Sequence, residues 1–191
     1  MKREHSKLYQ AKTRVKTLAF PLLLLLLALF LTACGPQKEE VQKGALDYQK
    51  IYQQKTLYVG DASKVGNMTN LLYYNDYREG IALQTDAEPY GITVNYEMPE
   101  ELAQKEVIPV TDEMLQNAAL MFCLIDNVDQ ITFAFHEEQD INSIAFSREQ
   151  FNVLFEKDIR VYGSSWEVFQ NDFVSLLEQQ EWREGFFDLQ Q

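Results

Sequence analysis

The alternation of apolar and polar side chains predicts two β-hairpins. Residues 80–85 and 90–96 alternate in this way, and the four residues between them, 86–89, are rich in turn-forming types. The same period of two recurs in residues 129–136, which we expect to pair with a short strand at residues 143–146. The sequence therefore predicts about four strands, joined as hairpins.

Apolar residues at helical spacing predict the remaining elements. The helix at 112–127 is apolar around nearly its whole circumference, with Thr111 as its N-cap, so it should be the central buried helix. A later helix begins at Ser147, which forms a capping box with Gln150. The other expected helices cover residues 46–53, a stretch after the turn at 58–67, and residues 165–180. This order predicts the α+β class, an antiparallel sheet of about four strands packed with helices on one face.

The first 33 residues have the pattern of a secretory signal. Six basic residues and one acid precede an apolar block at 18–31, which is short for a spanning helix. Leu-Thr-Ala-Cys at residues 31–34 then resembles the lipobox of bacterial lipoproteins, in which the cysteine takes a diacylglyceryl group. We expect a lipoprotein signal peptide at 1–33, a tether at 34–45 and a single extracytoplasmic α+β domain at 46–191. An uncleaved anchor helix with an incidental cysteine is the alternative.

The charge left after removal of residues 1–33 limits the partners. This mature chain holds 11 basic and 28 acidic residues, a net charge of −17. Nucleic acid and anionic lipid headgroups repel such a surface, so a nucleic-acid partner is excluded. We expect contact with the membrane through the lipid on Cys34, and an envelope protein or a small ligand as possible partner. Solubility alone also explains a high net charge.

Catalytic and metal motifs are absent from the sequence, and no cofactor is implied. Cys123 lies in an apolar run and is expected to be an inert small hydrophobe. His136 precedes Glu137, Glu138 and Asp140, which suits either a metal or a solvated acidic turn. With 28 acids in the mature chain, a carboxylate pair for hydrolysis is always conceivable, but spacing cannot locate it.

A glycine-rich loop before a helix is the candidate binding loop. It comprises Gly60, Asp61, Ser63, Lys64, Gly66 and Asn67. Such loops bind anions, but a turn with a capping residue, in which the glycines allow positive φ, explains the same pattern. An aromatic and polar cluster at 73–77 suits either a recognition surface or the cover of a core.

Four segments resemble the Firmicutes domain-of-unknown-function family 4825, namely residues 58–67, 83–85, 88–96 and 124–129. The resemblance covers residues 57–135 and implies an extracytoplasmic domain, found alone behind a lipobox or attached to membrane sensor-peptidases. That family has no established activity, so it implies no catalytic residues. We therefore expect a lipid-anchored protein on the extracytoplasmic face of the cell membrane, with a non-enzymatic binding or sensing role. An envelope hydrolase using a carboxylate pair and a purely structural lipoprotein are the alternatives.

Overall fold

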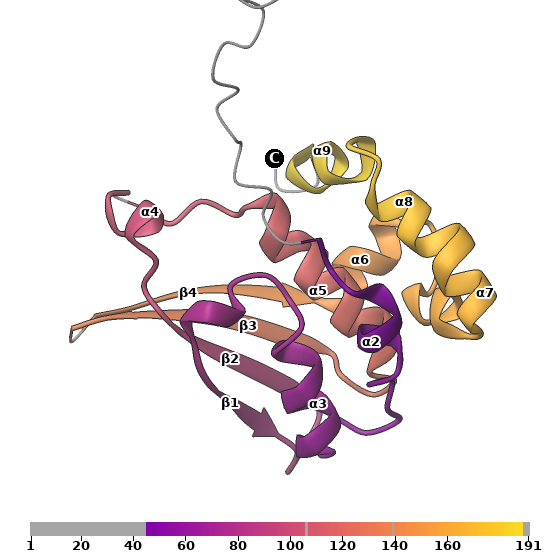
Figure 1. Cartoon of the computed structure of the whole chain (residues 1–191), viewed down its shortest axis with the longest axis horizontal. Helices are drawn as coiled ribbons and strands as arrows, with labels where there is room; N and C mark the ends of the chain where they lie inside the picture. Colours follow the sequence, from indigo (N-terminus) through magenta and orange to yellow (C-terminus); the bar gives the residue numbers. More distant parts are fainter. Residues whose placement is uncertain (1–44, 106, 139, 189–191) are drawn as a thin grey trace, which may run out of the picture. The chain divides into compact units, whose positions relative to one another are not determined.

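Four strands form one mixed sheet in the computed structural model, which describes residues 45–105, 107–138 and 140–188 (Figure 1). In order across the sheet they are β1 (Arg78–Gln84), β2 (Gly91–Glu97), β3 (Gln130–Glu137) and β4 (Asp140–Ser147). The predicted α+β class with four strands is confirmed. The outer pairs are antiparallel hairpins as expected, but β2 and β3 are parallel. The reason is that helices, rather than a tight turn, connect β2 to β3.

The helices largely follow the predicted pattern. They are α2 (Tyr48–Tyr52), α3 (Ala62–Thr69), α4 (Glu100–Ala103), α5 (Asp112–Leu124), α6 (Arg148–Leu154), α7 (Trp166–Val168), α8 (Ser175–Leu177) and α9 (Glu181–Asp188), with shorter 3-10 turns η1 (Asn75–Tyr77) and η2 (Ile159–Gly163) and a π-helical turn η3 (Phe169–Val174). The helix expected at 165–180 is α7, η3 and α8 in succession, whereas α4 and α9 were not expected. None of the described helices has the length and hydropathy to cross a bilayer. The predicted signal peptide and most of the tether lie outside the described residues.

The core lies between one face of the sheet and the helices. Ten of the thirteen residues of α5 are buried, as its apolar circumference predicted. The inward side chains of β2 and β3 are almost fully buried: Ile92, Val94, Tyr96, Ile131, Phe133 and Phe135. Burying each such side chain contributes about 1.5–3 kcal/mol. On β4, Phe146 packs against Phe186 of α9 with ring centroids 5.7 Å apart, so the last helix also covers this inner face.

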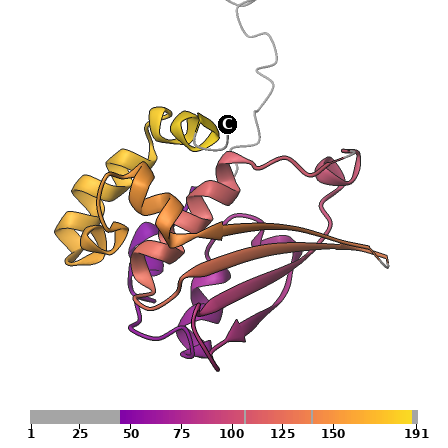
Figure 2. The ribbon, with the colours of Figure 1, turned by 180° about the vertical axis from the view of Figure 1, so that it is seen from behind.

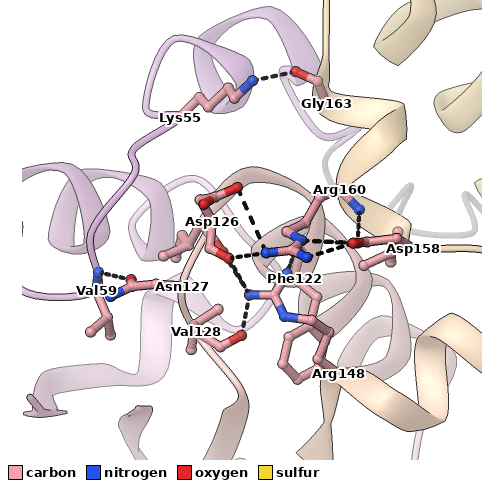
Figure 3. A network of polar contacts seen from close by, with 12 residues as sticks. Lys55, Val59, Phe122, Asp126, Asn127, Val128, Arg148, Asp158, Arg160 and Gly163 are labelled. Atoms are coloured by element: carbon pink, nitrogen blue, oxygen red, sulfur yellow. Dashed lines mark hydrogen bonds and ion pairs between the residues drawn. The ribbon is translucent and has the colours of Figure 1, made fainter. Parts of the chain in front are cut away.

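A buried arginine organises the connection between α5 and β3 (Figure 3). Arg148 is the first residue of α6, and only 7% of its surface is exposed. Its guanidinium donates to the carbonyl oxygens of Phe122 at 2.9 Å, Ile125 at 3.0 Å and Asp126 at 2.9 Å, and also to that of Val128. The last carbonyls of a helix have no partner within the helix, so a cationic donor at this end satisfies them.

The connection held by Arg148 in turn binds two other segments. The Asn127 side chain accepts a hydrogen bond from the Val59 N–H at 2.6 Å, just before α3 (Figure 3). The Asp129 side chain accepts one from the Tyr90 N–H at 3.1 Å, at the entry to β2. The backbone N–H of Thr56 donates to the Leu124 carbonyl at 3.0 Å. These bonds place the start of β3 beside the start of β2, where Gly91 pairs with Gln130 in parallel register.

The glycines of the candidate loop do not need the left-handed conformation that the sequence suggested. No described glycine has positive φ, and Gly66 lies within α3. A Cβ on Gly66 would meet its nearest atoms, on Arg78 and Ile81, at 3.9 Å, which is ordinary contact. Gly163 of η2 is different, because a Cβ there would lie 2.7 Å from the Cys123 carbonyl oxygen. Close approach of two backbones therefore explains Gly163 but not Gly66.

We predict that Arg148→Ala lowers the free energy of unfolding by about 3 kcal/mol or more, because it removes a buried side chain that donates to the carbonyls of Phe122 and Val128. Arg160→Ala is the matched control. Arg160 also donates to the Asp126 carbonyl, at 3.2 Å, but its side chain is 42% exposed. That substitution should cost less than about 1 kcal/mol. Urea denaturation measures both values, and equal losses would contradict the central role of Arg148.

We predict that Gly66→Ala raises the free energy of unfolding by about 0.5–1 kcal/mol, because alanine favours a helix over glycine and the site has room. Gly163→Ala should lower it by about 1–3 kcal/mol, because the added methyl overlaps the Cys123 carbonyl. Urea denaturation of the two variants checks these opposite signs. Destabilisation by Gly66→Ala would show that the glycine has another role.

Candidate functional site

The candidate loop lies at the start of α3, where its side chains complete the helix terminus. Asp61 is the N-cap, and its carboxylate accepts the Lys64 N–H at 3.1 Å. The Lys64 ammonium donates to the Gln53 carbonyl at 2.5 Å. Ser63 and Asn67 are exposed on the helix surface. The Asp61 oxygen stands where an incoming anion would bind, so the geometry supports a capping role, and a ligand role for these residues stays a prediction.

The aromatic cluster at 73–77 covers the core at one point. The Tyr74 ring packs edge-on against Tyr96 and Phe135, and its hydroxyl shares a hydrogen bond of 3.0 Å with Thr111, the N-cap of α5. The buried Asn117 side chain binds both the N–H and the carbonyl of Tyr73, each at 3.0 Å. These contacts give Tyr73 and Tyr74 a place in the fold.

Neither candidate for nucleophilic or metal chemistry lies in a suitable setting. Cys123 is 2% exposed, and its burial raises the pKa of the thiol, which keeps it protonated at neutral pH. His136 shares a hydrogen bond of 3.1 Å with the Asn95 side chain. Among the described residues, no three histidine, cysteine or carboxylate groups gather closely enough to hold a metal ion.

The sheet leaves one of its faces without a covering helix in the described part of the chain (Figures 1 and 2). We call it the open face. Strand alternation and register place these residues on it: Ala82, Thr93, Asn95, Thr132, Ala134, His136, Ile141, Ser143 and Ala145. They are mostly small or polar, unlike the aromatic and aliphatic inner row. A shallow hollow of about 210 Å³ lies over Thr93 and Thr132.

Carboxylates gather at one end of the sheet. A second hollow, of about 340 Å³, is bordered there by Glu79, Glu97, Glu137 and Glu138 together with His136. All four glutamates are exposed. They come from β1, β2, the end of β3 and the turn that joins β3 to β4, so the fold brings together acids that are far apart in the sequence. We call this region the acidic end.

Acidic residues in the middle of the sequence are hardly balanced by basic ones. The four strands lie within residues 78–147. After Arg78, this stretch holds 14 acidic residues and a single basic one, Lys105. Several cations elsewhere are bound inside the domain. Lys55 donates to the Gly163 carbonyl at 2.6 Å (Figure 3), and Arg183 donates to that of Leu177 at 2.7 Å. Seven of the 14 acids lie in the strands and their two hairpin turns, so the sheet carries more negative than positive charge. Counting charges along the chain, rather than in total, would have revealed this feature.

Comparison with known proteins identifies a family but no characterised relative. The family model "Domain of unknown function (DUF4825)" matches residues 51–147, from within α2 to the end of β4. No curated protein and no solved structure matches the chain. Three of the segments that resemble the family meet at the connection held by Arg148: residues 58–67, 88–96 and 124–129. Arg148 itself is the first residue after the matched region. This chain belongs to the DUF4825 family.

Proposed function

We propose that this protein is a lipoprotein anchored through Cys34 to the extracytoplasmic face of the cell membrane, and that its domain binds a basic envelope protein without catalysing a reaction. The observation that carries the proposal is the open face, with its acidic end, in a stretch that holds 14 acids and one lysine. The lipobox-like residues 31–34 support the anchor.

Electrostatics determines the class of partner. Exposed charges act over about 8 Å at physiological ionic strength, so carboxylates gathered at one end of a sheet add their fields at a docking partner. Such a field attracts lysine and arginine side chains and accelerates their encounter with the surface. The small side chains of the open face allow a partner's backbone to approach closely. A basic protein surface fits both properties.

The same carboxylates favour binding over hydrolysis. A glycosidase needs one carboxyl group that stays protonated, and enzymes achieve this by shielding the group from water. Glu79, Glu97, Glu137 and Glu138 are all exposed, and their hollow is shallow and open to solvent. This setting suits carboxylates that attract a cationic partner.

The anchor leads to a test in cells. We predict that Cys34→Ala prevents incorporation of a fatty-acid probe and releases the protein from its lipid anchor, because the lipid is attached to the cysteine sulfur. Metabolic labelling followed by gel analysis measures the incorporation. Cys123→Ala is the matched control and should keep full labelling. Label that persists on Cys34→Ala would contradict the lipoprotein assignment.

The binding role leads to a crosslinking experiment. A photoreactive phenylalanine derivative replaces Thr132 on the open face or, as control, Glu167, which is exposed on α7. We predict that illumination of intact cells crosslinks a basic envelope protein, identified by mass spectrometry, through position 132 but not through position 167.

A second substitution connects this crosslink to charge. Glu79→Gln with Glu97→Gln should reduce the yield of the adduct severalfold, because it removes two carboxylates of the acidic end. The control combines Glu156→Gln with Glu178→Gln. It removes two carboxylates that lie outside the sheet, after β4, and should leave the yield unchanged. Equal adducts at positions 132 and 167, or a yield insensitive to Glu79 and Glu97, would reject the binding surface.

A further inference from the structure

The two edges of the sheet differ in their openness to another strand. β4 pairs with β3 along its whole length without a register shift, and no described residue pairs with its other edge. β1, at the opposite edge, has an irregular register between Arg78 and Gly80 and carries charges there. Bulges and charged side chains are the usual protection of an edge strand. β4 has no bulge in its pairing with β3, and Asp140 is its only charged residue.

The free edge of β4 is accessible. Its residues from Asp140 to Ser143 are exposed, as is Ala145, and Ile141 is 63% exposed. The strand has no proline, glycine, lysine or arginine. In a strand, alternate backbone N–H and C=O groups point to opposite edges, so about half of those in β4 face away from β3. They can form the hydrogen bonds of a fifth strand.

We propose that an extended segment rich in lysine and arginine adds to the sheet along the free edge of β4, as a fifth strand. Backbone hydrogen bonds along β4 hold the segment, and its cationic side chains lie near the carboxylates of the β3–β4 turn. Glu137, Glu138 and Asp140 all lie at that turn. The inference rests on the proposed binding role and specifies how the partner is recognised.

A second copy of this chain is the competing occupant, and charge disfavours it. Two mature chains each carry a net charge of −17, and pairing their β4 strands would bring two acidic sheets together. A basic segment experiences attraction at the same place. Charge complementarity therefore selects a cationic partner strand for this edge.

The test uses the full chain in non-ionic detergent and a fluorescein-labelled peptide of four Lys-Val repeats. Alternation places all lysines on one face of the added strand. The control peptides replace lysine by glutamate, or keep lysine but carry N-methyl groups on the backbone. Fluorescence anisotropy at low ionic strength should show saturable binding of the first peptide and at least about tenfold weaker binding of both controls, since one lacks the charge and the other the hydrogen-bond donors.

Protein variants locate the site. Glu137→Gln, Glu138→Gln and Asp140→Asn together should weaken binding of the Lys-Val peptide by about tenfold. The matched triple variant Glu156→Gln, Glu167→Gln and Glu178→Gln should bind as the wild type does. Equal binding of the N-methylated peptide would overturn strand addition, and equal weakening by both triple variants would overturn the location. Absence of peptide binding, or sedimentation of the chain as a dimer that excludes the peptide, would also overturn the inference. The crosslink through position 132 is independent of these results, so the two proposals can fail separately.

Discussion

The hydrogen bonds of the buried Arg148 guanidinium are the interaction on which the rest of the domain depends. Burying a cation costs several kcal/mol unless other groups replace its water. Here carbonyl oxygens at the end of α5 and in the following connection do so. Each side of the interaction therefore satisfies the other. Because the connection leads directly into β3, the arginine also determines how β3 joins β2.

The consequence for function comes from the parallel pairing of β2 and β3. It joins two hairpins into one sheet and gathers their acids at one end of the sheet. The helices lie on the other face, where aromatic packing fills the core and internal hydrogen bonds bind several of the cations. The domain is thus divided into a helical scaffold and an acidic sheet. This division, rather than a cleft with shielded reactive groups, is why a binding role fits the protein.

Local patterns in the sequence predicted much of this fold. Thr111 and Ser147 cap α5 and α6 as expected, and the alternation in both hairpins gave the correct inner faces. The parallel pair could not be predicted, because it depends on a connection whose partners are distant in the chain. The role of Arg148 could not be predicted from the sequence either, since its carbonyl partners lie 20 to 26 residues earlier. The π-helical turn η3 and the short α4 also lack a clear periodic signal.

The candidate site was predicted less well than the fold, for a related reason. The glycines at 60–67 suggested a binding loop, yet the geometry of these residues is that of a capped helix start. The acidic end is built from β1, β2 and the β3–β4 turn, so no single stretch of sequence displays it. The strand order places β4 at an edge of the sheet, and sequence alone does not show which strand lies at an edge.

Hydrogen exchange resolved by residue, on the full-length protein in its native membranes and in detergent, tests the central claim most directly. If the sheet is the binding surface for an envelope partner, amides of β4 should exchange more slowly in the native membranes than in detergent. Those of α7 and α8 should exchange equally in both preparations. Slower exchange confined to α7 and α8, or identical exchange throughout the domain, would contradict the account.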